Sequence, residues 1–246
     1  MLALAVVCFG VGGWEYIQEK CAGDDYTQLQ KNVSSDEQEK KDLQVEAEEK
    51  TSVEIPIDFA ALQERNPDVY AWIRIPGTKI DYPILQSRTD DQYYLTHTIN
   101  GEEKAEGAIY TEHYNSQSFE DLNTVIYGHD MRNGSMFQNL HNYEDQSFFD
   151  QNREVIIYTS TAIRHYRIFA AYLYDDRHLM QSFDFTDKGV YRAYLNMIFS
   201  IRDMNAHIDT SMDVGTDDRI ITLSTCYGNQ EDKRYLVQAV LVSIEQ

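Results

Sequence analysis

Three side chains that could take part in catalysis stand at the ends of three apolar runs. Cys226 closes the run 219–226, His129 closes the run 125–129, and Arg234 opens the run 234–244. Runs rich in β-branched and aliphatic residues and bounded by turn residues are typical of buried strands. A residue at the end of such a strand is held firmly and can still meet a substrate. We therefore expect the three side chains to converge on one groove.

A thiol, an imidazole and a guanidinium together suit acyl transfer. A thiol attacks a carbonyl only as the thiolate, so it needs a partner that removes its proton. A histidine can take this proton and later return it to a leaving amine. The tetrahedral intermediate carries a negatively charged oxygen, which an always protonated arginine can stabilise. Cys226, His129 and Arg234 supply these three functions.

The short separation between Cys226 and Arg234 suits two adjacent antiparallel strands joined by a loop of about seven residues. The two side chains would then face each other, and His129 would come from a third neighbouring strand. Asp130 directly follows His129 and could tune its imidazole, although adjacency in sequence does not bring two side chains together. The remaining histidines lie in no motif and receive no role. The residues that flank the cysteine are candidates for substrate binding or for strand packing, namely Ser224, Thr225 and Tyr227.

The number and placement of the cysteines limit what Cys226 can do. Cys8 and Cys21 lie in or just after an apolar N-terminal run, which leaves Cys226 alone in the rest of the chain. One cysteine builds neither a disulfide framework nor a four-ligand zinc site. For the acyl transfer described above we expect no metal and no obligatory cofactor. A free cysteine is commonly a small buried core residue, and only its companions His129 and Arg234 favour a nucleophile.

Composition divides the chain into three segments. Residues 1–21 begin with an apolar run shorter than the span of about 20 residues that crosses a membrane, and we interpret them as an uncleaved N-terminal membrane anchor. A buried N-terminal helix of a soluble protein is the alternative. Residues 22–53 are acidic and polar and are interpreted as a solvated stalk. Residues 54–246 are the predicted catalytic domain, which would then lie outside the cell.

The net charge of −20 argues against nucleic acid as a partner. A nucleic-acid binder must neutralise phosphates with lysine and arginine, and this chain has 21 of these against 41 aspartates and glutamates. Solubility explains the acidity, and attraction of a cationic partner is a second explanation.

Short strands dominate the predicted catalytic domain, which favours a mainly β fold with a closed or nearly closed barrel of roughly eight strands. The predicted strands are 69–75, 79–85, 107–111, 124–129, 155–160, 164–174, 219–226 and 234–244. Helical spacing of apolar residues predicts helices at 57–65, 135–143 and 187–201, with a helical turn at 90–97.

Several of these strings resemble sortases. Residues 222–226 (TLSTC) are similar to the Thr-Leu-x-Thr-Cys signature of that family, and residues 125–129 (VIYGH) resemble its catalytic-histidine strand. The string 127–143 and the helix 187–201 are similar to the class B branch. The resemblance implies a closed eight-stranded sortase-type β-barrel with an N-terminal helix and an additional helix before the cysteine strand.

The resemblance also implies a reaction. Sortases are cysteine transpeptidases that cleave a C-terminal sorting signal of the LPxTG or NPxTx kind from secreted proteins. Cys226 would hold the acyl group as a thioester, His129 would be the general acid/base, and Arg234 would donate to the oxyanion and the substrate backbone. An amine of a peptidoglycan precursor would resolve the thioester and anchor the protein to the cell wall. Some members instead polymerise pilins through a lysine amine.

Three alternatives compete with this interpretation. A papain-like peptidase would carry Cys-Trp on a helix, whereas Cys226 follows a predicted strand. The L,D-transpeptidases have a His-Gly/Ser-x-x-x-Cys pattern that this sequence lacks. An extracellular binding module on a stalk, with no enzymatic activity, would bury Cys226 and make it slow to alkylate.

Overall fold

One sheet that closes on itself forms the body of the protein in the computed structural model, which describes residues 26–33, 53–228 and 230–246. The strands are β1 (Val69–Arg74), β2 (Asp81–Leu85), β3 (Ile109–Tyr110), β4 (Asn123–Tyr127), β5 (Glu154–Thr159), β6 (Ile163–Asp175), β7 (His207–Ile208), β8 (Ile220–Tyr227) and β9 (Gln230–Glu245). The helices are α3 (Phe59–Arg65), α4 (Tyr93–Thr96), the 3₁₀ helix η2 (Gln138–Glu144), α5 (Gln146–Gln151), α6 (Leu179–Ser182) and α7 (Lys188–Phe199), and residues 26–33 are also helical.

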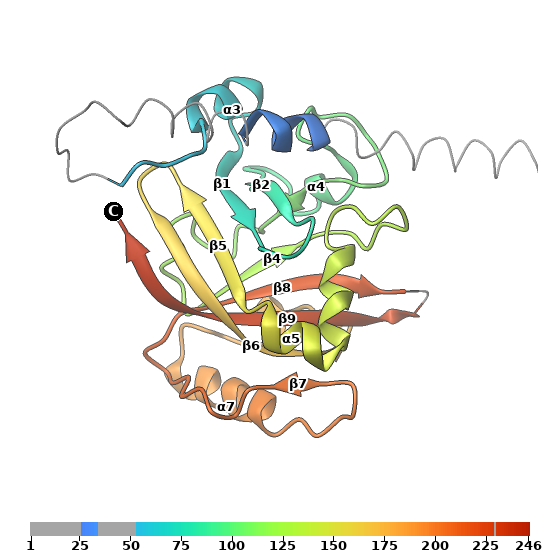
Figure 1. Cartoon of the computed structure of the whole chain (residues 1–246), viewed down its shortest axis with the longest axis vertical. Helices are drawn as coiled ribbons and strands as arrows, with labels where there is room; N and C mark the ends of the chain where they lie inside the picture. The colour runs from blue at the N-terminus through green and yellow to red at the C-terminus, as the bar shows by residue number, and fades with distance from the viewer. Residues whose placement is uncertain (1–25, 34–52, 229) are drawn as a thin grey trace, which may run out of the picture.

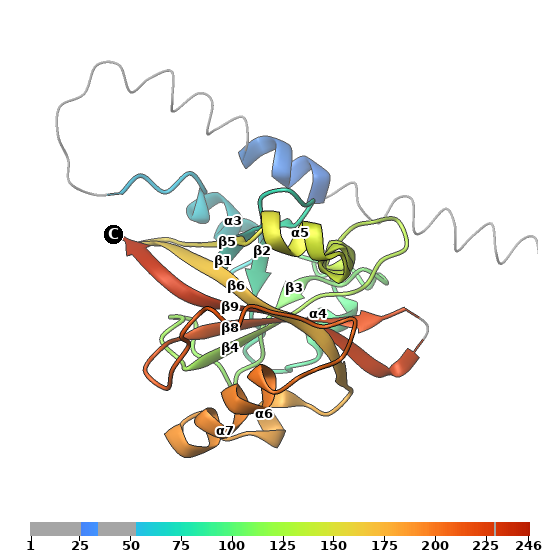
Figure 2. The ribbon, with the colours of Figure 1, turned by 60° about the horizontal axis from the view of Figure 1, so that its bottom comes forward.

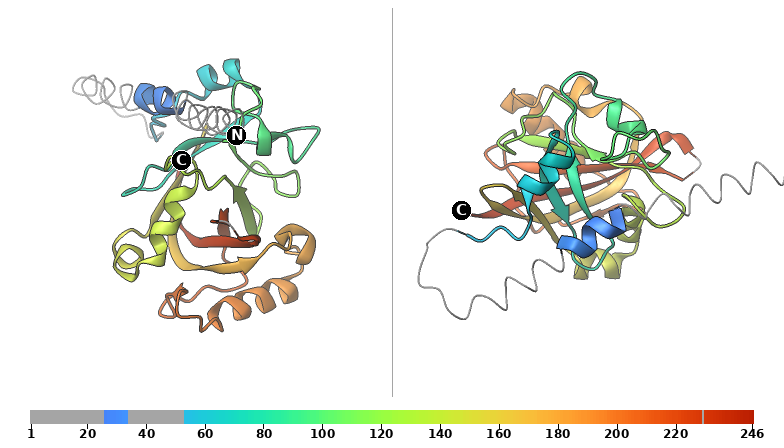
Figure 3. Two further views of the ribbon diagram at one scale, coloured as in Figure 1. Left: turned by 90° about the vertical axis from the view of Figure 1, so that its right-hand side faces the viewer. Right: turned by 90° about the horizontal axis from the view of Figure 1, so that it is seen from above.

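The strands follow the order β5-β1-β2-β3-β4-β8-β9-β6-β7, and a further pairing of β5 with β6 closes the ring. The ring therefore contains eight strands, and the short β7 is added outside it on β6. This confirms the predicted eight-stranded barrel with an N-terminal helix and a helix before the cysteine strand. Figures 1 and 3 show α3 at one side of the barrel and α7 at the opposite side.

Strand β8 is buried on both faces, which explains its unbroken apolar run. Ile221 and Leu223 point into the main core of the barrel, whereas Ile220 belongs to a second cluster under α7. A strand covered on both sides reads as continuously apolar and not as alternating. In Figure 2, α6 and α7 lie together beneath the strands that they cover.

Helix α7 provides the cover for this outer face. Tyr191, Tyr194, Leu195 and Ile198 are buried at the spacing of one helical face. The Asp187 carboxylate accepts hydrogen bonds from the main-chain amides of Gly189 and Val190, which would otherwise lack partners at the first turn.

The predicted helix 135–143 differs from the observed one in type and start. Met136 has a φ of 55°, which is incompatible with a right-handed helix, so regular structure begins only with η2 at Gln138. Asp145 then caps α5 by accepting from the Phe148 amide. The buried face was predicted well, because Phe137, Leu140 and Tyr143 are all fully buried.

Only part of the predicted N-terminal segments lies within the described residues. Residues 26–33, inside the predicted stalk, form a helix that buries Tyr26, Leu29 and Val33 against the barrel core. These three residues have the spacing of one helical face. The predicted anchor at 1–21 lies outside the described residues, and in the described part of the chain no helix has the length and apolar character of a membrane span.

We predict that Asp187→Ala lowers the free energy of unfolding by about 1 kcal/mol, because two amides at the start of α7 lose their acceptor. Asp187→Asn is the matched control, since asparagine caps a helix about as well as aspartate. Urea unfolding of the two variants and the wild type measures the difference. Equal destabilisation by both substitutions would show that the cap hydrogen bonds are not the cause.

Candidate active site

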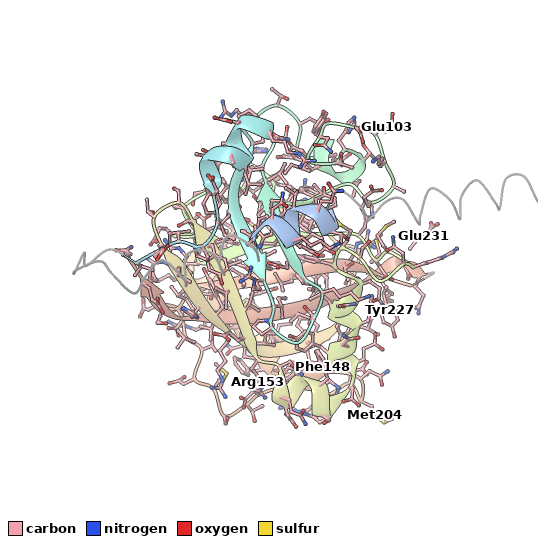
Figure 4. The ribbon with its side chains drawn as sticks, turned by 45° about the horizontal axis from the view of Figure 1, so that its top comes forward. Glu103, Phe148, Arg153, Met204, Tyr227 and Glu231 are labelled. Atoms are coloured by element: carbon pink, nitrogen blue, oxygen red, sulfur yellow. The ribbon has the colours of Figure 1, made fainter. Side chains whose placement is uncertain are left out.

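Cys226 and Arg234 lie opposite each other on the β8–β9 hairpin. Strand β8 runs antiparallel to β9, and Cys226 is the register partner of Arg234. The ladder continues past a bulge to Tyr227 and Gln230, so the connecting turn is shorter than the predicted loop. In Figure 4, Tyr227 and Glu231 mark this end of the hairpin.

His129 reaches the same edge of the sheet from β4. Strand β4 runs parallel to β8, with Tyr127 paired to Ser224, and the Gly128 amide donates to the Ser224 carbonyl at 3.2 Å. His129 and Cys226 therefore each follow the last paired residue of parallel neighbouring strands by the same two positions. Gly128 has no room for a side chain, because a Cβ there would lie 2.7 Å from Cγ of the fully buried Phe137.

One pocket is lined by all three predicted catalytic residues. It has a volume of about 230 Å³, and its walls come from α4, the ends of β4 and β8, and the chain from Tyr174 to Leu179. The Cys226 side chain is a free, exposed thiol. The catalytic roles of Cys226, His129 and Arg234 stay predictions.

The His129 ring is oriented by a hydrogen bond. Its Nε2 lies 2.6 Å from the carbonyl oxygen of Leu95, which lies within α4. A carbonyl oxygen can only accept, so Nε2 carries a proton. In the neutral ring this leaves the lone pair on Nδ1, which is therefore the nitrogen able to take a proton from a thiol.

Arg234 is held by the main chain of its own hairpin. Its Nη1 donates to the carbonyls of Glu231 and Lys233, both at 2.9 Å. These bonds bring a permanent positive charge to the pocket wall beside Cys226. A substrate oxygen that gains negative charge there would meet a preorganised donor.

The predicted substrate-binding residues separate into two groups. Ser224 and Thr225 are buried and line the pocket. The Thr225 hydroxyl finds no hydrogen-bond partner among the described residues. Tyr227 lies beyond the pocket lining, with its ring centroid 5.5 Å from that of His141 and 6.2 Å from that of Tyr235.

The pocket also contains a histidine–carboxylate contact that the sequence did not reveal. His178 Nε2 lies 2.7 Å from Oε2 of Glu112, and both side chains line the pocket. Burial raises the pKa of Glu112, and the hydrogen bond from His178 opposes this shift. Neither residue belongs to a motif, so no sequence signal pairs them. Asp130, considered as a partner of His129, instead contacts His141 and the Gly228 amide.

No cluster of three or more histidine, cysteine, aspartate or glutamate side chains in the described ranges could hold a metal ion. The ionisable side chains that line the pocket are those of Cys226, His129, His178, Arg177, Arg234, Glu112, Asp176 and three tyrosines.

Comparison with known proteins places this geometry in a family. The sequence profile of the sortase domain matches residues 73–242. Sortase B of Listeria monocytogenes is 33% identical over 192 residues, which cover 77% of this chain and 76% of the relative. The crystal structure of Clostridium perfringens sortase B has a TM-score of 0.67 and 31% identity, over 75% of this chain and 99% of that one.

A further similar structure is Spy0129, a Streptococcus pyogenes class B sortase involved in pilus biogenesis. It has a TM-score of 0.63 and 29% identity, over 76% of this chain and 98% of that chain. The sequence matches and the structural matches agree on the same branch. This chain belongs to the sortase family of cysteine transpeptidases, and its relatives place it in class B.

Proposed function

We propose that this chain cleaves a C-terminal sorting signal of secreted proteins and transfers the new carboxyl group to an amine of a peptidoglycan precursor. The observation that carries the proposal is the meeting of Cys226, His129 and Arg234 around one pocket, in a chain of the sortase family. The signal would be of the LPxTG or NPxTx kind, with cleavage after its threonine.

The proposed first step forms a thioester. Nδ1 of His129 takes the proton of the Cys226 thiol, and the sulfur attacks the threonine carbonyl of the signal. The guanidinium of Arg234 donates to the resulting oxyanion. The carbon–nitrogen bond then breaks, and the leaving amine takes its proton from the His129 imidazolium.

The proposed second step reverses these roles. The incoming amine loses a proton to His129 and attacks the thioester carbonyl. Arg234 again stabilises the oxyanion, and the carbon–sulfur bond breaks to release the thiolate, which regains its proton from His129. No group other than these three side chains and the two substrates is needed to balance the protons.

The wall of the pocket supports peptide binding. The hydroxyls of Thr225 and Tyr174 are buried, line the pocket and find no partner among the described residues. Buried polar atoms ordinarily have partners, and these two hydroxyls would gain one from a peptide that displaces the atoms covering them. We include Ser224 in this substrate-binding wall, and we keep Tyr227 as a candidate for the part of the substrate that extends beyond it.

One related structure supports a second candidate function. Because Spy0129 is a class B sortase involved in pilus biogenesis, the resolving amine of this chain could be a pilin lysine. A binding module without activity is disfavoured, since it predicts a buried Cys226 and the thiol is exposed.

We predict that incubation with sorting-signal pentapeptides and an amine yields a ligated product, and that Cys226→Ala and His129→Ala each lower its rate by about 10³-fold or more, because a nucleophile and its base act as a unit. Mass spectrometry of the wild type should detect the thioester. Offering a peptidoglycan-type amine and a lysine-bearing peptide in competition distinguishes the two candidate functions. Equal product from wild type and Cys226→Ala would exclude Cys226 as the nucleophile.

We predict that Arg234→Ala lowers kcat by about 10²- to 10³-fold, the usual effect of losing one oxyanion donor. Arg234→Lys keeps the charge but loses the planar fork, so we expect it to recover only part of this loss. Steady-state ligation kinetics measure both variants. Full activity of Arg234→Lys would show that charge alone suffices, and full activity of Arg234→Ala would remove the arginine from the mechanism.

We also propose that residues 1–21 anchor the chain in the cell membrane as a single span, with residues 22–53 as a linking segment and residues 54–246 on the outer side.

We predict that the full chain fractionates with membranes, whereas a chain lacking residues 1–21 does not. Protease added to intact cells should degrade the catalytic domain. Recovery of the full chain in the soluble fraction would refute the anchor.

A further inference from the structure

His141, on η2, lies between two carboxylates and the main chain of the predicted nucleophile. Its Nδ1 is 2.9 Å from Oε1 of Glu144. Its Nε2 is 3.1 Å from the carbonyl oxygen of Cys226 and 3.4 Å from Oδ2 of Asp130. The His141 and Asp130 side chains retain only 16% and 19% of their exposure. The ring is therefore enclosed and faces an acceptor at each nitrogen.

This arrangement defines the charge of the His141 ring. Carboxylates and carbonyls only accept hydrogen bonds, so acceptors at both nitrogens require an N–H at each, which is the imidazolium. Burial acts to lower the pKa of His141, but the hydrogen bonds to Asp130 and Glu144 outweigh it and raise that pKa. The hydrogen bond from His141 is the main cause of the lowered pKa of Asp130.

The His141–Asp130 pair joins the two segments that carry the predicted proton acceptor and nucleophile. Asp130 directly follows His129, and its Oδ2 also lies 3.3 Å from the Gly228 amide, two residues after Cys226. The imidazolium contacts the Cys226 carbonyl from outside the pocket, while the thiol faces into it. The main-chain segments that carry His129 and Cys226 are thus both in contact with the His141–Asp130 ion pair.

We propose that His141 is a positioning residue for the transfer reaction: through Asp130 and the Cys226 carbonyl, its imidazolium holds the loop of His129 against the end of β8. The inference rests on the proposed function, because a fixed distance between the Cys226 thiol and His129 matters only if a proton passes between them. His141 does not touch the reacting atoms and is not itself catalytic.

The groups around the ring determine how this contact depends on pH. Beyond Asp130 and Glu144, the ring faces Tyr227 on β8 and Tyr235 on β9, whose centroids lie 5.5 and 5.2 Å away. Burial raises the pKa of both tyrosines, so they stay neutral in the range that matters.

The stabilisation from the His141–Asp130 ion pair is lost both at high pH and at low pH. Because the folded pKa of His141 is raised, its share is complete below the ordinary histidine value of about 6.5 and is lost as pH rises through the folded value. Because the folded pKa of Asp130 is lowered, its share is present above the ordinary value of about 3.9 and is lost as pH falls through the folded value.

The chain contains a matched control for this histidine. His165 also lies between two carboxylates, Glu154 and Glu245, with both nitrogen–oxygen distances at 3.1 Å. It sits at the other end of the long β6–β9 ladder, far along the register from the Cys226–Arg234 pair. Replacing His165 removes the same chemistry from a place that cannot position the nucleophile.

The test compares His141→Ala with His165→Ala in the full chain. We expect His141→Ala to lower kcat about 10- to 100-fold, the scale of a small misplacement of reacting groups, with KM within about twofold of wild type. We expect His165→Ala to keep kcat within about twofold. The two variants should lose comparable stability in urea unfolding. A kcat for His141→Ala equal to that of His165→Ala would overturn the proposal.

Two further measurements keep the test decisive. If His141→Ala does not fold, Glu144→Gln removes one carboxylate, 37% exposed, from the His141 ring. The pKa of His141 should then fall, so we expect kcat of this variant to begin to decline at a lower pH than kcat of the wild type. An unchanged pH profile would overturn the proposal. If wild type gives no ligation, the proposed function fails. The rate of Cys226 alkylation by iodoacetamide then decides, with a change in His141→Ala alone expected and equal rates overturning the inference.

Discussion

The pairing of β8 with its two neighbours is the constraint on which the rest of the structure depends. Its parallel ladder with β4 aligns the chain after Tyr127 with the chain after Ser224, and its antiparallel ladder with β9 sets Arg234 against Cys226. The two ladders run from the interior of the strands to the pocket, where Tyr127 pairs with Ser224 and Cys226 with Arg234. The reactive side chains can therefore be exposed at the ends while their positions remain fixed.

Burial on both faces of β8 protects that register. A slip by one residue would move Ile221 and Leu223 from the barrel core to the side of α7, and Ile220 in the opposite direction. Helix α7 therefore contributes to the register, because its apolar face covers the outer face of β8 and excludes water from it.

Charge is organised differently at the two sides of the pocket. Inside it, Arg234 and the His178–Glu112 pair face the space where a peptide would lie. Behind it, His141 and Asp130 hold the main chain. Two carboxylates are partly buried here, and each has a hydrogen-bond donor close by: Glu112 has His178, and Asp130 has His141 and the Gly228 amide. These donors lower the free-energy cost of removing the carboxylates from water. The acidity of the chain therefore has local structural uses beside solubility.

The eight strands that close the barrel, the buried faces of the main helices, the facing of Cys226 and Arg234 and the resemblance to the family could be predicted from the sequence, because each depends on local periodicity or on a short string. The two-residue strand β7 could not, because it is too short to show a period. The partners of side chains outside the strands follow only from the folded chain. His141 and the Cys226 carbonyl are 85 residues apart, and Asp130 and Gly228 are 98 apart. Asp130 pairs with His141, and not with its neighbour His129, because the chain path sets where its carboxylate lies. Such contacts follow no period, and only the closed barrel brings them together.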